Sequence, residues 1–211
     1  MLLLVALTQL ALGQATPPAD PAPSVPSIWS AVPLRGGSVA TAWAGWASFG
    51  LAYAQGMTDL DDLGGGVDLD WATTELRLGA FYRRPLAVRG GWDLGARVGL
   101  GWYAGFGGQW VRDANRSDRG IELAPALVFS RPAAGGLISG AVELPFTFTF
   151  RRGGGMLFRP RLAFGYETGL WRDLAIGVRG GLGWRGGAGE PPLPEGRGDL
   201  LFIATATYRV F

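Results

Sequence analysis

Cysteine, histidine and lysine are all missing from this chain of 211 residues. Without cysteine there are no disulfides and no thiolate nucleophiles, and without histidine there are no Ser-His-Asp triads or histidine-based zinc sites. All 19 basic residues are arginine, and against 17 acidic residues they leave a formal net charge of +2. That charge is too small to indicate a nucleic-acid partner. We therefore do not expect an enzyme, and we expect no catalytic residue, cofactor or metal site.

Long apolar runs are also missing, since none approaches the roughly 18–20 residues of a membrane helix. Yet 48% of the residues are hydrophobic, and the mean hydropathy is +0.18. A chain can be this apolar without helical spans if its apolar residues alternate along strands. The 36 glycines disfavour helices and suit tight turns and crowded barrel interiors.

The first 36 residues do not follow the strand pattern of the rest. Residues 1–15 form a short apolar core that ends in Gly13-Gln14-Ala15. They resemble a secretory signal peptide cleaved before Thr16, with a short membrane anchor as the alternative. Residues 16–36 contain prolines at 17, 18, 21, 23, 26 and 33. This composition predicts an extended linker.

Eight segments alternate bulky apolar side chains with small or charged ones, which predicts strands. They cover residues 39–54, 73–84, 91–106, 120–130, 136–150, 156–170, 173–185 and 199–211. In the first of them we place Thr41, Trp43 and Phe49 on one face, with small residues on the other. Residues 63–70 also alternate, but in the opposite phase to the strand that follows. This requires either a bulge near residues 72–73 or a separate short strand.

The predicted connections alternate in length. Residues 85–90, 131–135 and 171–172 form short turns, whereas residues 57–70, 107–119 and 186–199 form longer loops, with 151–155 the shortest of the second set. The bulky apolar faces suit a lipid surface, because a small barrel has room inside only for its own side chains. Residues 37–211 therefore predict an all-β fold, an antiparallel up-and-down transmembrane β-barrel of about eight strands. A soluble lipocalin-like binding barrel with an apolar lumen is the alternative.

The strand pattern over residues 39–211, with Phe211 at its end, resembles the small outer-membrane β-barrel proteins of Gram-negative bacteria, of the OmpA transmembrane-domain, OmpX and OmpW type. The resemblance implies a monomer in the cell outer membrane, surrounded by outer-membrane lipid, with residues 16–36 as a periplasmic linker. It also implies that the barrel-assembly machinery reads the C-terminal strand. Phe211 shares the phase of Arg209, however, and not that of Tyr208 and Val210, which departs from the family pattern.

Charged residues on the inward faces form the main candidate site. They are Glu75, Arg77, Asp93, Arg97, Glu122, Glu143, Arg159, Arg161, Glu167, Asp173, Arg179 and Arg209. Because unpaired buried charge is costly, we expect these residues to pair across strands and to plug the lumen. This predicts a structural, adhesive or envelope-related role. A narrow pore or small-solute transporter, or a polar ligand pocket, is the alternative.

An acidic run at positions 59, 61, 62, 68 and 70 could bind Ca²⁺. Its spacing does not match an EF-hand, and we expect a solvated extracellular loop instead. We also expect the glycines at 64–66 to lie in this loop.

Overall fold

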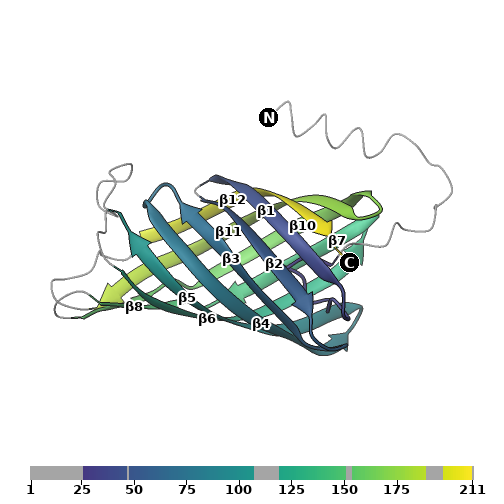
Figure 1. The fold of residues 1–211 in the computed structure, drawn as a ribbon, viewed down its shortest axis with the longest axis horizontal. Coiled ribbons are helices and arrows are strands. Elements are labelled where there is room, and N and C mark those ends of the chain that lie inside the picture. The colour runs from purple at the N-terminus through teal and green to yellow at the C-terminus, as the bar shows by residue number, and fades with distance from the viewer. Residues whose placement is uncertain (1–25, 47, 107–118, 151–153, 189–196, 211) are drawn as a thin grey trace.

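The structure, a computed structural model, describes residues 26–210 except 47, 107–118, 151–153 and 189–196. The described residues form an all-β, antiparallel closed barrel of 10 strands, without helices (Figure 1). The strand segments are β1 (Ser38–Trp46), β2 (Ser48–Gly56), β3 (Asp62–Asp70), β4 (Glu75–Arg89), β5 (Trp92–Gly105), β6 (Arg119–Ala133), β7 (Gly136–Glu143), β8 (Phe146–Thr149), β9 (Met156–Phe158), β10 (Arg161–Trp171), β11 (Leu174–Ala188) and β12 (Arg197–Arg209).

Pairing between the first and last strands closes the barrel. β1 pairs with β12 from Val39↔Arg209 to Trp46↔Phe202, and β12 pairs with β11. Two of the strands are interrupted. β7 and β8 both pair with β6 on either side of Pro145, and β9 and β10 both pair with β11 on either side of Pro160. Proline has no N–H to donate to a ladder, and both interruptions coincide with a proline.

The predicted number of about eight strands is wrong, and the additional strands lie in the first third of the barrel. Residues 39–54 form parts of two strands, β1 and β2, which pair with each other and lie on either side of residue 47. The phase of inward and outward side chains changes between β1 and β2. Val39 and Thr41 are buried on the lumen side and Trp43 lines the lumen cavity, whereas Phe49 is exposed. The assignment of Thr41 and Trp43 to the same face as Phe49 is therefore wrong.

The predicted loop at residues 57–70 is also wrong. Residues 62–70 form β3, which pairs with β2 and β4 along its whole length, and the glycines at 64–66 lie within it. Residues 71–74 turn into β4, so the phase reversal marks a new strand rather than a bulge. The register shifts of the barrel lie elsewhere, between Pro85 and Ala87 and between Gly169 and Trp171.

The two ends of the barrel differ. The terminal end, where β1 begins and β12 ends, carries the connections 57–61, 90–91, 134–135 and 172–173. Two of these are tight hairpins with positive φ at both central residues, at Gly90–Gly91 (59° and 78°) and Ala134–Gly135 (48° and 75°). This is the turn geometry that matches strand twist. Turn 71–74 lies at the opposite end, the loop end, where β5, β8 and β11 end and β6, β9 and β12 begin.

In the connection 57–61, the Tyr82 hydroxyl donates a hydrogen bond to Asp61 at 2.5 Å, and Arg84 lies 3.7 Å from the same carboxylate. The hydrogen bond from Tyr82 lowers the pKa of Asp61. This contact fixes the connection against the outside of β4.

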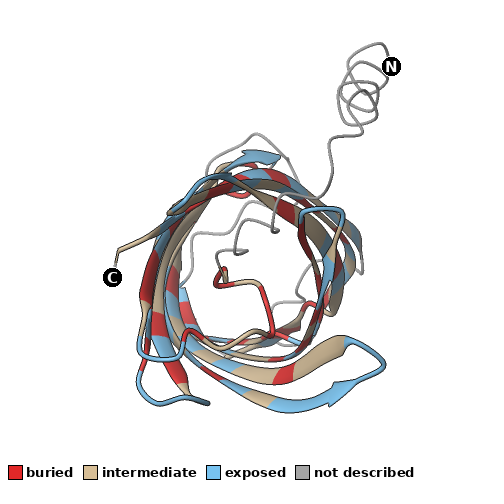
Figure 2. Ribbon diagram, turned by 90° about the vertical axis from the view of Figure 1, so that its right-hand side faces the viewer, coloured by how far each residue is buried: buried red, intermediate tan, exposed pale blue. Residues whose placement is uncertain are grey.

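The outer wall is apolar, and the ion pairs of the lumen lie on its inner side. Buried and exposed residues alternate along the strands (Figure 2). Outward positions carry large exposed side chains, such as Leu100 (62% exposed), Leu182 (69%) and Phe202 (59%). Outward Trp and Tyr residues lie toward the two ends. They are Trp46, Trp71, Trp102 and Trp184 at the loop end, and Tyr53, Tyr82, Trp92, Trp171 and Tyr208 at the terminal end.

Candidate functional site in the barrel lumen

Residues 26–37 enter the barrel from the terminal end and form a plug, seen inside the ring of strands in Figure 2. Ser27, Ser30 and Ala31 are completely buried. The chain turns on itself where the Ser30 N–H donates to the Ser27 carbonyl, and the Ala31 N–H donates to the Ser130 hydroxyl on β6 at 2.6 Å. We expected residues 16–36 to be a linker, and no local pattern in this segment indicates that part of it fills the lumen.

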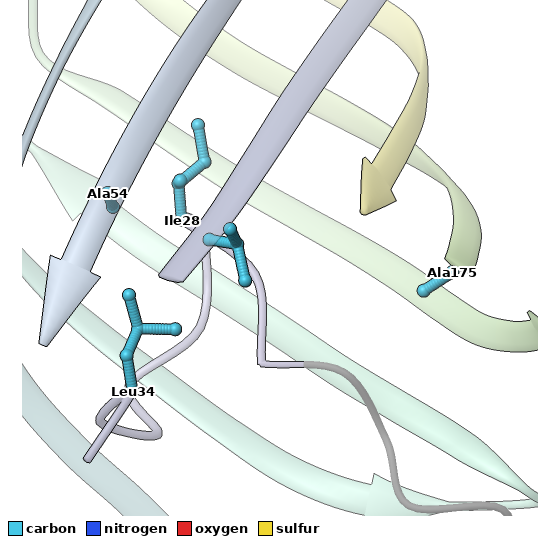
Figure 3. Packing of buried hydrophobic residues seen from close by; sticks show 5 residues of the cluster. Ile28, Leu34, Ala54 and Ala175 are labelled. Carbon is cyan, nitrogen blue, oxygen red and sulfur yellow. The ribbon is translucent and has the colours of Figure 1, made fainter. Parts of the chain in front are cut away.

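Apolar side chains of the plug pack against the inner wall. Ile28 and Leu34 are buried in one cluster with Val39, Ala54 and Ala175, from β1, β2 and β11 (Figure 3). Small inward alanines leave the space that the plug side chains occupy. The plug therefore replaces part of the side-chain filling that a small barrel otherwise supplies from its strands.

A buried ion pair holds the plug. Arg83 on β4 and Asp62 on β3 are both fully buried, and two nitrogens of Arg83 donate to Asp62 Oδ2 at 2.8 and 2.6 Å. The remaining terminal nitrogen of Arg83 donates to the carbonyls of Ser27 and Ser30 at 2.7 and 2.6 Å. Asp62 Oδ1 accepts the Leu34 N–H at 3.0 Å. The pair thus satisfies backbone groups at both ends of the plug.

Further into the barrel, three arginines surround one carboxylate. Arg97 donates to Glu143 at 3.0 Å, and Arg161 Nε lies 3.3 Å from the other oxygen of Glu143. Arg179 lies 3.5 Å from Glu143. We call these four residues the deep cluster. Trp29 of the plug covers two of the guanidinium groups, at 5.6 Å from Arg97 and 4.8 Å from Arg179.

A second group, the mouth cluster, lies toward the loop end. It consists of Asp68, Asp70, Glu75, Arg77, Arg159 and Arg185. Glu75 is completely buried and pairs with Arg77 at 2.7 Å and with Arg159 at 3.0 Å. Arg77 also reaches Asp68 at 3.3 Å. Arg159 comes from the interrupted β9–β10 strand, so this cluster spans the lumen.

The structure brings together only part of the predicted network. Seven of the twelve residues lie in the two clusters. Glu122 accepts a hydrogen bond from Thr147 at 3.1 Å, and Glu167 is buried near Ser27. Asp93, Asp173 and Arg209 lie near the terminal end and form no ion pair with any described residue.

Sequence reasoning missed several lumen charges. Asp62, Asp68 and Asp70 were expected in a loop, and Arg83 and Arg185 were left out of the network. The sequence does carry a signal for the three aspartates. They alternate with Leu63, Val67 and Leu69 along β3, and because those side chains point outward, the aspartates point into the lumen.

The calcium alternative finds no support where the chain is described. Asp59 and Asp61 lie in the connection 57–61, apart from the three aspartates that face lumen arginines. Within the described ranges, no group of three or more acidic side chains is arranged to hold a metal ion. Those ranges also contain no helix long and apolar enough to cross a membrane.

Between the two clusters lies a cavity of about 260 Å³. Ile28 and Trp29 of the plug contribute to its lining at one side, and arginines and acids of both clusters line it together with apolar side chains such as Trp43 and Phe81. Small residues on β5 and β6, Gly99, Ala124 and Ala126, leave this space open.

No protein-family model, curated protein or solved structure matches this chain. The predicted signal peptide at residues 1–15, the first part of the linker and Phe211 lie outside the described residues.

Proposed function

We propose that this chain is an outer-membrane β-barrel protein with a structural, adhesive or envelope-related role and a closed lumen. The outer wall carries this proposal. Exposed Leu, Val, Ile and Phe side chains continue around the strands, including Leu51 on β2, Leu127 on β6 and Val178 on β11. Soluble monomers rarely expose contiguous apolar patches larger than a few hundred Å². Lipid tails would cover this wall.

The closed backbone supports the same proposal. In the core of a bilayer every backbone N–H and C=O needs a protein partner, and a closed barrel provides one without a free edge. β1–β12 pairing gives this closure. Trp and Tyr toward both ends fit the two interfaces, where such rings are favoured. The charged lumen counts against the lipocalin-like alternative, which requires an apolar one.

Two features support a closed lumen. The plug is anchored by Arg83 and Asp62, and the deep and mouth clusters cross the remaining space. A narrow pore remains the second candidate, because the cavity beyond the plug gives a pore part of the path it needs. The two candidates differ in whether the plug blocks the passage of ions through the lumen.

We expect the full chain, refolded into a planar bilayer, to show no single-channel steps. Replacing Ile28 and Trp29 together by glycine removes the two plug side chains that border the cavity. We expect small, reproducible conductance steps from this double variant, because the cavity is widened on the plug side, where Ile28 and Trp29 border it, while the barrel wall is unchanged. Single-channel recording at fixed salt is the measurement.

The matched control is Trp171→Gly, which removes an aromatic side chain that is 70% exposed on the outside. It should stay silent. Steps from the unmodified chain that change in Arg97→Ala or Glu143→Ala would favour the pore and contradict the closed lumen.

A further inference from the structure

The deep cluster carries more positive charge than its own carboxylate balances. Arg97, Arg161 and Arg179 meet a single acid, Glu143, within 3.5 Å. All four residues line the cavity. Unbalanced charge in the interior is costly unless it is paired and hydrogen-bonded. Glu143 alone does not balance the three arginines, so the cluster has room for a further negative group.

Arg179 has the least satisfied guanidinium of the three. Its side chain is only 2% exposed, and neither terminal nitrogen donates a hydrogen bond to any described residue. The Trp29 ring lies 4.8 Å away over one face of the guanidinium, which leaves the N–H edge for a further acceptor. A buried donor without a partner costs the full loss of its hydration.

Other acids do not remove this surplus. Asp62 already forms an ion pair with Arg83. Glu167 interacts electrostatically with Arg179, but it is not part of the cavity lining. Even with Glu167 counted, the arginines of the deep cluster outnumber the nearby carboxylates. Toward the loop end, Arg77, Arg159 and Arg185 also line the cavity, but Asp68, Asp70, Glu122 and Asp199 line it with them and outnumber them, so the net negative charge would repel an anion there. An anion is therefore favoured at the deep cluster and disfavoured at the mouth.

We propose that the deep cluster binds a small oxyanion, a carboxylate or phosphate group, which accepts hydrogen bonds from Arg179 and is attracted by Arg97 and Arg161. Arginine is suited to this role because its fork of N–H groups matches carboxylate and phosphate oxygens. A cavity of about 260 Å³ admits such a group with its nearest substituent. The inference does not depend on the membrane role, because it concerns the lumen alone.

The test is calorimetric titration of the full chain, folded in a non-ionic detergent, with inorganic phosphate and separately with acetate. We expect saturable binding of at least one probe at one site, which weakens as sodium chloride is added. Arg179→Gln should weaken binding by roughly tenfold, because it removes a charged hydrogen-bond donor. Glu143→Gln should tighten binding, because it removes the carboxylate that competes with the ligand.

Arg185→Gln is the matched control, since Arg185 also lines the cavity but lies in the mouth cluster, 4.0 Å from Asp70. The affinity of the Arg185→Gln variant for the probe should stay within about twofold of the parent value. The absence of saturable binding of either probe to correctly folded protein would overturn the proposal and leave the barrel assignment untouched. Equal losses in Arg179→Gln and Arg185→Gln would also overturn it, because they would indicate diffuse charge attraction rather than a site. Heat-modifiable gel migration verifies that each variant is folded.

Discussion

Arg83→Met should be among the most destabilising single substitutions in this barrel, with a loss of about 3–5 kcal/mol in the free energy of unfolding. The change leaves the Asp62 carboxylate buried without its partner. It also removes the donor to the Ser27 and Ser30 carbonyls, so the plug loses its anchor. Urea unfolding of the protein in lipid vesicles, followed by tryptophan fluorescence, measures the effect.

Arg84→Met is the control, because Arg84 is the next residue on β4, points outward and is 54% exposed. It should cause little loss. Adding Asp62→Asn to Arg83→Met should restore part of the stability, because the lone buried charge is removed. Similar losses from Arg83→Met and Arg84→Met would contradict the role of this ion pair.

Arginine at an outward position near the middle of the barrel should cost about 2–4 kcal/mol in a lipid bilayer. Leu100 on β5 pairs with Ala80 and Leu123, well inside the strand, and Leu127 on β6 pairs with Ala96 and Val142. In the proposed membrane orientation, Leu100→Arg and Leu127→Arg place a charge among lipid tails. Equilibrium folding titrations into vesicles of two bilayer thicknesses measure the cost, which should be larger in the thicker bilayer.

Phe148→Arg provides the depth control. Phe148 lies one residue from the end of β8, where a charge should cost only about 0–1 kcal/mol because it can reach the interface. Gly99→Arg tests the opposite face at the level of Leu100, and its cost should follow lumen packing rather than bilayer thickness. Unimpaired folding of Leu100→Arg would mean that the faces are assigned backwards.

The sequence predicts the β-barrel class and the inward charges well where one strand shows one uninterrupted alternation. β5 is such a strand, with Trp92, Val98 and Trp102 outward and Arg97 inward. The prediction fails between β1 and β2, because the sequence at residues 46–48 is Trp-Ala-Ser, in which serine is the one residue typical of turns. Without a stronger turn signal, the alternation predicts one long strand in place of β1 and β2. It therefore places Thr41 and Trp43 on the same face as Phe49, which is wrong.

β3 and the plug show why composition misleads. Glycine is depleted in most strands, yet Gly64 is buried in β3, where an added Cβ would meet the inward ring of Phe81 at 2.4 Å. The composition of the plug predicts a Pro- and Ser-rich linker, because the order of the plug comes from contacts with distant strands, among them the Asp62–Arg83 pair and the cluster around Ile28 and Leu34. Contacts between segments so far apart leave no local pattern.

The central claim, a barrel whose apolar wall requires lipid, is tested most directly by the solvent in which the chain folds. We expect β-rich circular dichroism and heat-modifiable gel migration in detergent or lipid vesicles, and aggregation after dilution from urea into plain buffer. A folded, monomeric protein with the same β-rich spectrum in plain buffer would contradict the account.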